Sequence, residues 1–540
     1  MNAVRRLAAP TSLWTILMAG SLVCAWLAIL VWPIPFWASH DDYAYLSLAH
    51  ALHLQAILQH EVVGLDLGLV NHPGLPFYVS SWLALRAATS FAGAQDVIGY
   101  ALVHPDSFFL ATRVTAGLVA AAAIAGTMSL GTALAAPWRF VPVLVFFAAS
   151  PASVRYGLAF LGNETFALPL SVFFFWCLRY LAKAPPDARW PWLALGAVCA
   201  VGYTVKLLYL DLAVAAVAVA VVDSYWARER RQPWVFGLAC RVGLFTTAFI
   251  CLTSVLLLLV IRRYATINLL AFHMRVVNHT GLYDTGEVGV LSAQALRDAA
   301  GEMFSTPLPY LLIGGIGLTV VRFTAQARVG SVDRGTLLWS TAAIAAALAA
   351  TAAVLKHYEG HYLVAVSAVL PFLMMPLLGD RWLRWFAAAA TLAALCVTVP
   401  RVTAEFSDDK RLVASIAQDE AAIAAMPLSP TDARLWTYRV PNKRFAAGFV
   451  ARVSGVTSLV TTLADPAKQD LSSYAAVRRR YRYIVLDRAA YPDADAVRHA
   501  KGSLESSISD PTDPMAMVRF DPRDKIHVLR SVIVGERPAD

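Results

Sequence analysis

The sequence predicts an α-helical protein that crosses a membrane many times, and three observations lead to this prediction. Of the 540 residues, 58% are hydrophobic and only 15% are charged, whereas soluble domains have about 45–50% apolar and about 25% charged residues. The mean hydropathy is +0.57. The apolar residues come in blocks of about 20, the length that a helix needs to cross ~30 Å of hydrocarbon. This composition excludes a soluble enzyme, a disordered chain and a coiled coil.

Eleven apolar segments are predicted to cross the membrane. The first lies at 12–38 and is too long for the core of a cleaved signal peptide. The others lie at 107–132, 138–158, 165–182, 190–205, 207–225, 236–261, 306–321, 335–355, 361–379 and 383–400. The expected fold class is therefore an α-helical polytopic membrane protein with about 11 transmembrane helices.

Charged residues divide the chain into two expected domains. Nearly half of them lie in the last quarter of the chain, which predicts a transmembrane domain at 1–400 and a soluble domain at 401–540. The string YRYIVLD at 481–487 is typical of a strand, so the soluble part is expected to be a small α/β domain. The first outer loop, 40–106, is apolar, and we expect helices at 42–60 and 73–91 that lie at the membrane surface. The second helix could instead be a span, but it would reverse the side of every later loop.

The basic residues predict which side of the membrane each loop faces. If the chain has eleven spans, the basic residues of six loops all lie on the same side of the membrane as the N-terminus. The positive-inside rule assigns that side to the cytoplasm. The domain at 401–540 would then lie on the exterior face of a bacterial inner membrane. The net charge is +9, and the tail has 21 basic against 18 acidic residues, a balance that argues against a nucleic-acid partner. The loop residues are Arg5, Arg6, Arg139, Lys183, Arg189, Arg228, Arg230, Arg231, Arg322, Arg328, Arg334, Arg381 and Arg384.

Three carboxylates are candidates for chemistry on the exterior side. Asp41 and Asp42 directly follow the first span, and Glu164 opens the fourth. Of two adjacent carboxylates, one can accept a proton while the other binds a metal or a substrate. The alternative is that all three stabilise helix N-termini. The six cysteines lie in apolar segments, so neither a disulfide framework nor a cysteine metal site is expected.

Several cationic side chains are candidates for binding phosphate. His72 lies in a turn before an apolar helix, and Lys206 lies between two apolar runs. A lysine at the bilayer centre costs about 2.5–3.5 kcal/mol, so Lys206 either extends to the interface or meets an anion. The polar loop at 262–305 is either a phosphate clamp or a solvated loop. Between two spans, the string at 356–362 is too dense in ionisable groups for a plain connector; its candidates are Lys356, His357, Glu359, His361 and Tyr362.

Together these motifs resemble the GT-C superfamily of membrane glycosyltransferases, in the branch of the protein mannosyltransferases and aminoarabinose transferases. The string DDYAY at 41–45 is similar to the D-E-x-x-Y pattern that follows the family's first span. The string NHPGLPFY at 71–78 is similar to the K-P-P-L-x-Y turn, with His72 at the lysine position. Arg113 matches an arginine early in the second span, and Glu164 matches a second acidic residue. The string TVK at 204–206 is similar to T-K-G.

The resemblance implies a glycosyltransferase that moves a sugar from a polyprenyl-phosphate donor to an acceptor hydroxyl, with inversion at the anomeric carbon. Asp41 would be the base, while Asp42 and Glu164 would hold the acceptor or a divalent cation, the one cofactor expected. The partners would be the donor, the lipid bilayer and a protein, lipid or polysaccharide acceptor. The residues expected to bind substrate are His72, Arg113, Lys206, Lys356, His357, Glu359, His361 and Tyr362.

The sequence leaves two other functions open. A transporter or flippase of a lipid-linked sugar would have broken helices near mid-membrane, often with internal repeats, and the sequence shows neither. A non-catalytic envelope assembly protein would tolerate the joint loss of Asp41, Glu164 and His361.

Overall fold

The computed structural model describes most of the chain between residues 74 and 424. The described ranges are 74–97, 105–131, 136–159, 161–185, 187–228, 234–280, 291–329 and 331–424, with a few residues between them and six short strands nearer the C-terminus. The expected first span, almost all of the expected helix at 42–60, and Asp41, Asp42 and His72 lie outside the described residues.

The chain divides into two compact units. The helical unit comprises 1–32, 69–81 and 112–405, and the second unit comprises 33–68, 82–111 and 406–540. The last helix, α17, runs from Arg381 to Ala424 and so continues beyond residue 400, where the last apolar span was expected to end.

The helices carry most of the described structure. They are α4 (Leu75–Phe91), α6 (Pro105–Leu130), α7 (Phe140–Ala149), α8 (Pro151–Val154), α9 (Ala167–Lys183), α10 (Trp190–Val205), α11 (Asp211–Arg228), α12 (Trp234–Asn278), α13 (Ala293–Phe304), α14 (Leu308–Arg328), α15 (Arg334–Lys356), α16 (Leu363–Met374) and α17. Short turns join them: η2 (Ala136–Arg139), the π-helical η3 (Arg155–Ala159), η4 (Asn163–Phe166), η5 (Leu207–Leu210), η7 (Gly360–Tyr362) and η8 (Met375–Gly379).

The count of eleven spans is not confirmed. Among the described residues, eight helices are long and apolar enough to cross a membrane, or nine if a bent pair is counted as one. That pair, Phe140–Ala149 and Pro151–Ala159, is bent by 114°, a broken helix that the hydropathy pattern did not reveal. The helix α10 has only 16 residues, which is about 24 Å at 1.5 Å per residue. The helix expected at 73–91 is present as α4 and is not among the candidate spans; its place at the membrane surface stays a prediction.

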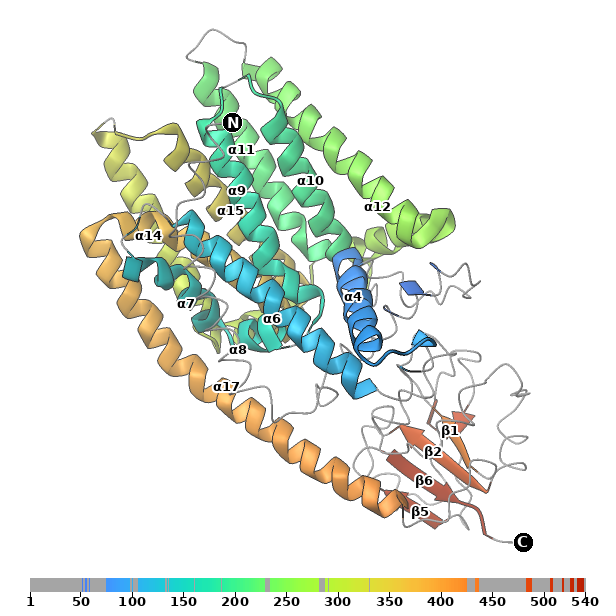
Figure 1. Ribbon diagram of the computed structural model, residues 1–540. Coiled ribbons are helices and arrows are strands. Elements are labelled where there is room, and N and C mark those ends of the chain that lie inside the picture. Colours follow the sequence, from blue (N-terminus) through green and yellow to red (C-terminus); the bar gives the residue numbers. More distant parts are fainter. Residues whose placement is uncertain are drawn as a thin grey trace. The chain divides into compact units, whose positions relative to one another are not determined.

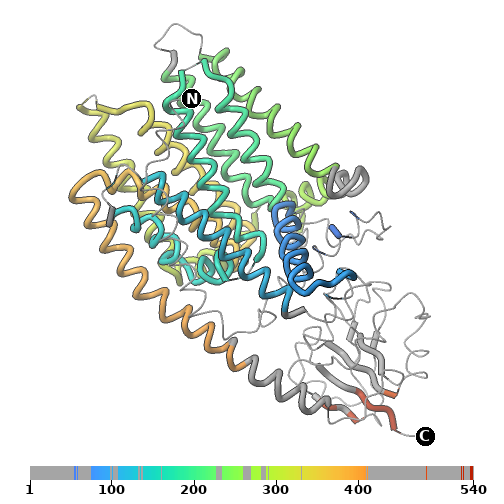
Figure 2. Tube along the Cα trace, in the orientation of Figure 1, coloured from blue at the N-terminus to red at the C-terminus, as the bar shows by residue number. Residues whose placement is uncertain are grey.

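The helix α16 forms the centre of the helical unit. All of its residues are buried, as expected of a helix that is apolar on every side. It packs against α7, α9, α14 and α15, and the rings of Phe175 and Phe372 stack at 4.3 Å between centroids. The helices α9, α10, α11 and α12 run side by side (Figure 1 and Figure 2). A Cβ at Gly196 would lie 2.4 Å from the carbonyl oxygen of Phe245, so α10 and α12 approach closely only because this residue is glycine.

The expected loop at 262–305 is largely helical, which corrects the prediction. The helix α12 continues past its apolar part to Asn278, and residues 293–304 form α13. The extension is held by tertiary contacts: the Tyr203 hydroxyl lies 2.8 Å from Nδ1 of His273, and both side chains are buried. The polar residues of 262–278 therefore do not form a loop.

Arginines that predicted the cytoplasmic side meet at one end of the helical unit. Arg384 Nε donates to the carbonyl oxygen of Leu378 at 2.8 Å, and Arg334 Nη1 donates to that of Ala184 at 2.9 Å. Arg322 Nη1 donates to the carbonyl oxygen of Pro376. These arginines bind carbonyls that end helices, where a positive charge is favoured by the helix dipole.

A buried carboxylate lies at the same end. Asp223 on α11 is 2.7 Å from Nε of Arg334 and 2.9 Å from Nε of Arg241. The Asp223 side chain is 1% exposed, so one carboxylate joins the ends of α11, α12 and α15. We call this group the Asp223 cluster.

In the second unit the described strands form two small sheets. The larger has the order β1-β2-β6-β5, with β1 and β2 parallel and the other pairs antiparallel. The strand predicted at 481–487 is present as β2. An α/β domain is not confirmed, because the described residues after α17 are strands and short flanking segments. The strands are β1 (Ala433–Trp436), β2 (Tyr483–Asp487), β3 (Ser506–Ser507), β4 (Met517–Val518), β5 (Lys525–Val528) and β6 (Val532–Glu536).

Candidate functional site

Three breaks between helices bring polar side chains together at the end of the helical unit opposite the arginines. Glu164 lies in η4 before α9, Lys206 lies between α10 and α11, and His361 lies in η7 between α15 and α16. The far ends of these helices carry the basic residues described above. Each helix therefore places one polar residue at the same end, although the three positions are far apart in the sequence.

The centre of this group is a buried ion pair. Lys206 Nζ donates to Oε1 of Glu164 at 2.7 Å, and the two side chains are 7% and 1% exposed. The same nitrogen lies 3.1 Å from Nε2 of His361. It also lies over the Tyr362 ring, 4.0 Å from the centroid, a distance typical of a cation–π contact. We call Glu164, Lys206, His361 and Tyr362 the Glu164 cluster.

A second carboxylate borders this cluster. His361 Nε2 lies 3.1 Å from Oε2 of Glu359 and 3.5 Å from Oε1 of Glu164. The imidazole is therefore placed between two carboxylates and an ammonium group. The ring of Tyr156 contacts His361 at 5.7 Å between centroids, so the π-helical turn η3 contributes to the wall of the site.

Local backbone geometry explains why these residues leave the helices. Lys206 has an extended conformation (φ −162°, ψ 144°), which ends α10 before η5 begins. At η4, the backbone N–H of Gly162 donates to Oγ1 of Thr165 at 3.0 Å, and this bond fixes the turn that carries Glu164. Helix ends leave backbone groups unsatisfied, and π-helical turns such as η3 are frequent at functional sites.

Asn163 supplies a buried acceptor beside Glu164. The residue is 6% exposed, and its Oδ1 accepts no hydrogen bond from any described residue. Its backbone carbonyl accepts a hydrogen bond from the Tyr209 hydroxyl at 3.2 Å. A buried polar atom without a partner costs about 1–3 kcal/mol, so Oδ1 is suited to accept a hydrogen bond from a ligand hydroxyl.

The other residues of the string at 356–362 have a different place. Lys356 Nζ donates to the carbonyl oxygen of Val277, and His357 Nε2 lies 3.0 Å from that of Val276. Both side chains therefore bind the C-terminal end of α12, where cations are favoured. Burial raises the pKa of Tyr358, and the nearby carboxylate of Glu302 raises it further.

The remaining predicted site residues are not in the Glu164 cluster. Arg113 is buried on α6, while Asp41, Asp42 and His72 lie outside the described residues. The structure thus brings together Glu164, Lys206, Glu359, His361 and Tyr362. In the described part of the chain, no three His, Cys, Asp or Glu side chains are arranged to hold a metal ion.

Sequence reasoning did not select Tyr156, Asn163 or Tyr209 as site residues. Their signal in the sequence is weak: Asn163 and Tyr156 flank the break before the fourth expected span, and Tyr209 follows Lys206 by three residues. In the sequence, only the short spacing from these residues to Glu164 and Lys206 indicates that they belong to the site.

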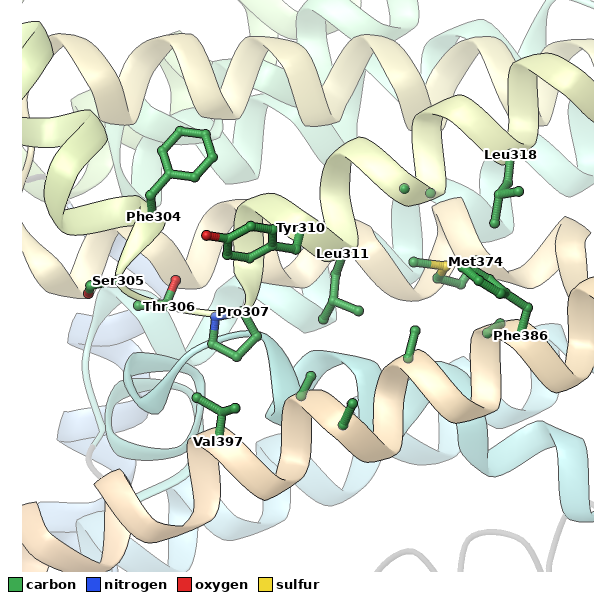
Figure 3. Close-up of a pocket in the computed structure, with 16 residues that line it drawn as sticks. Phe304, Ser305, Thr306, Pro307, Tyr310, Leu311, Leu318, Met374, Phe386 and Val397 are labelled. Atoms are coloured by element: carbon green, nitrogen blue, oxygen red, sulfur yellow. The ribbon is translucent and has the colours of Figure 1, made fainter.

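An apolar groove of about 520 Å³ lies elsewhere in the helical unit. Figure 3 shows Tyr310 and Leu311 of α14 facing Val397 of α17 across it. Met374 of α16 and Phe386 of α17 lie toward its other end. We call it the α14–α17 groove; its other lining residues are Phe304, Ser305, Thr306, Pro307, Gly314, Gly315, Leu318, Ala387, Ala390, Ala393 and Ala394.

Two solved structures resemble this chain at low sequence identity. The crystal structure of ArnT from Cupriavidus metallidurans, bound to undecaprenyl phosphate, matches with a TM-score of 0.53, 12% identity and 99% coverage of both chains. AglB, an archaeal oligosaccharyltransferase from Archaeoglobus fulgidus in complex with an inhibitory peptide and a dolichol-phosphate, matches with a TM-score of 0.46. That match has 12% identity and covers 90% of this chain and 71% of the other. The second score is too low to establish a shared fold.

Searches by sequence give no further relatives: no protein-family model matches the chain, and no curated protein does. The fold comparison covers nearly the full length of both this chain and ArnT, which is a GT-C glycosyltransferase. The resemblance predicted from the short motifs is therefore confirmed for the fold, and this chain has the fold of the GT-C membrane glycosyltransferases.

Proposed function

We propose that this protein is a membrane glycosyltransferase that moves a sugar from a polyprenyl-phosphate donor to an acceptor hydroxyl. The observation that carries this proposal is the Glu164 cluster, in which a buried carboxylate, an ammonium group and an imidazole meet at the ends of three helices. The fold supports it, because ArnT has this fold and was crystallised with undecaprenyl phosphate.

The reaction requires few groups from the protein. A carboxylate takes the proton of the acceptor hydroxyl while that oxygen attacks the anomeric carbon, and the bond between that carbon and the lipid phosphate breaks. The electron pair leaves with the phosphate, and direct displacement inverts the anomeric centre. Asp41 remains the proposed base, with Asp42 beside it. Lys206 would stabilise the charge that grows on the phosphate.

The sugar and the acceptor need hydrogen-bond partners in the same place. Oδ1 of Asn163 is a buried acceptor without a described partner, and we assign it to a hydroxyl of the sugar or the acceptor. Glu164 would act with Lys206 as a fixed ion pair that orients the donor phosphate. Arg113, Glu359 and the Tyr362 ring would complete the binding site.

The lipid part of the donor needs an apolar surface within the bilayer. The α14–α17 groove is lined by leucine, alanine, glycine and aromatic side chains, a composition suited to an isoprenoid chain. We assign the lipid tail to this groove.

The exterior face of a bacterial inner membrane is the proposed side for the reaction. The arginines described above gather at one end of the helical unit, and the Glu164 cluster lies at the other. By the positive-inside rule the arginine end faces the cytoplasm, so the site would open to the exterior. Residues 401–540 would lie on the exterior side as well. A polyprenyl-phosphate sugar is a suitable donor on that face because the transfer then needs no nucleotide sugar.

The test is a transfer assay in proteoliposomes with radiolabelled polyprenyl-phosphate sugar and extracted envelope acceptors. Wild-type protein should release polyprenyl phosphate and label an acceptor. Asp41→Asn and Glu164→Gln, compared per amount of folded protein, should each lose at least 100-fold in rate, the usual scale of a positioned acid–base or electrostatic group. The matched control variants are Asp187→Asn and Glu302→Gln, whose side chains are exposed, and they should transfer at the wild-type rate.

The same vesicles distinguish the runner-up function. The bent pair of helices at 140–159 is a feature that transporters also use. Movement of the labelled lipid across the bilayer without any sugar transfer would replace the transferase by a flippase. Wild-type activity of Asp41→Asn would remove Asp41 from the base role.

A further inference from the structure

We propose that the ammonium group of Lys206 is the resident cation of this site, in the position that a divalent metal ion would need on the Glu164 carboxylate. This inference concerns the site of the proposed function, and its first readout does not depend on sugar transfer. It replaces the expected role of Glu164 as a metal ligand.

The first argument is the distance between the two groups. Lys206 Nζ lies 2.7 Å from Oε1 of Glu164. Divalent cations bind carboxylate oxygens at about 2.0–2.6 Å, so an ion on this oxygen would fall in the space that the ammonium fills. Two cations so close would repel each other strongly in a site that excludes water.

The second argument is how firmly the ammonium is held. It has the Glu164 carboxylate on one side, Nε2 of His361 at 3.1 Å on another, and the Tyr362 ring at 4.0 Å on a third. An ammonium group has three N–H donors, and these three partners match them. With 7% of its side chain exposed, Lys206 has little freedom to leave the carboxylate.

The third argument is the ligand set that would remain without the lysine. Oε1 of Glu164 lies 3.5 Å from Nε2 of His361, and Oε2 of Glu359 lies 3.1 Å from the same nitrogen. Oxygen and nitrogen ligands of one tetrahedral zinc ion lie about 2.0–2.2 Å from it, which places neighbouring ligand atoms about 3.3–3.6 Å apart. The spacing between Glu164 and His361 falls in this range, and the ammonium contacts both groups, 2.7 Å from Oε1 and 3.1 Å from Nε2. The ammonium therefore takes the place of an ion that this carboxylate and this imidazole would share.

The consequence is a fixed positive charge that needs no loading with metal. A carboxylate neutralised by lysine cannot also recruit a divalent ion, so phosphate departure would be stabilised by a charge that is part of the chain. Sugar transfer should then be independent of divalent metal ions, and removal of the lysine charge should create a metal site in a protein that lacked one.

The test compares bound metal in purified protein after the affinity tag is removed. Wild type, Lys206→Met, and the double variant Lys206→Met/Glu164→Gln are equilibrated with Zn²⁺ or Mn²⁺, passed through a desalting column and measured by mass spectrometry of the metals. We expect no stoichiometric ion in wild type, about one ion per chain in Lys206→Met, and its loss in the double variant. The control Lys183→Met, at an exposed lysine, should behave as wild type.

Two results would overturn the inference. One is a stoichiometric ion in wild type that is lost in Glu164→Gln. This comparison involves no change at Lys206, so it tests the inference even if Lys206→Met does not fold. The other is a folded Lys206→Met protein that gains no ion. A transfer rate of wild type that EDTA abolishes and added metal restores would also contradict it. If wild type transfers no sugar at all, the proposed function fails while the metal measurements still stand.

Discussion

Lys206 Nζ lies 2.7 Å from the Glu164 carboxylate, although 42 residues separate them and both side chains are almost fully buried. A buried charge without a partner costs several kcal/mol. Here the ammonium has a carboxylate, an imidazole nitrogen and a ring face around it. The pair therefore makes it possible to keep a charge at the end of three apolar helices, where the proposed chemistry needs one.

The first prediction concerns the coupling of these two residues. Glu164→Gln and Lys206→Met should each destabilise the protein by about 3–5 kcal/mol, because each leaves the other charge buried without its partner. The double variant should lose less than the sum, with a coupling of about 1–3 kcal/mol. Unfolding of the four proteins in detergent, followed by intrinsic fluorescence, measures the cycle.

A matched pair of residues controls this cycle. Glu302→Gln and Lys183→Met make the same chemical changes at exposed positions on different helices, and their effects should add within about 0.5 kcal/mol. If the effects of Glu164→Gln and Lys206→Met were additive too, the contact between these residues would contribute nothing to the free energy of unfolding.

The second prediction separates the ring of Tyr362 from its hydroxyl. Tyr362→Phe keeps the face over which Lys206 lies, whereas Tyr362→Leu removes it. The leucine variant should be about 0.5–2 kcal/mol less stable than the phenylalanine variant, the range for cation–π contacts, and should have the higher KM for the donor. At Tyr225, which is 65% exposed, the same two substitutions should differ little; equal losses for both variants at Tyr362 would argue against the ring contact.

The sequence identified most residues of the Glu164 cluster but did not predict which of them contact one another. Glu164, Lys206 and His361 could be selected because each interrupts or borders an apolar run and must lie near a helix end. Their distances depend on how α9, α10 and α16 pack, which no local pattern contains. Lys356 and His357 show the opposite case: the same density of charge predicted substrate binding, while both side chains bind the end of α12.

The fold was predictable where hydropathy decides and not where tertiary contacts decide. Apolar runs located α6, α9 and α15 within two residues at each end, and they located the starts of α14, α16 and α17 equally well, but α17 continues to Ala424. Hydropathy falls near Arg262, so 262–305 was expected to be a loop, but the Tyr203–His273 contact continues α12 to Asn278. The 114° bend at Ser150 escaped prediction because residues 138–158 were interpreted as one apolar run across Ser150 and Pro151.

The third prediction concerns the Asp223 cluster. Asp223→Asn would leave the buried Arg241 and the half-buried Arg334 without their carboxylate, so the protein should lose about 3–5 kcal/mol of stability. The cluster lies at the other end of the helices from Glu164, so the kcat of the folded fraction should not change. Thermal unfolding and transfer assays on the same preparation separate the two effects.

The control for this variant is Asp333→Asn. Asp333 caps α15, and its Oδ1 accepts a hydrogen bond from the backbone N–H of Thr336 at 2.9 Å. Asparagine caps helices about as well as aspartate, so stability should stay within about 0.5 kcal/mol of wild type. A stability loss at Asp333 equal to that at Asp223 would mean that the buried ion pairs have no special weight.

The fourth prediction tests the α14–α17 groove with two glycines of one helix. Nothing lies within 4 Å of a Cβ added at Gly314 or at Gly317, but only Gly314 lines the groove. Leucine favours the helix at either position by about 1 kcal/mol over glycine, so both variants should fold. Gly314→Leu fills space that the lipid tail would use. It should therefore raise the KM for a long polyprenyl-phosphate donor about tenfold while leaving a short-chain donor unaffected, and Gly317→Leu should change neither. Equal effects on long and short donors would place the lipid tail elsewhere.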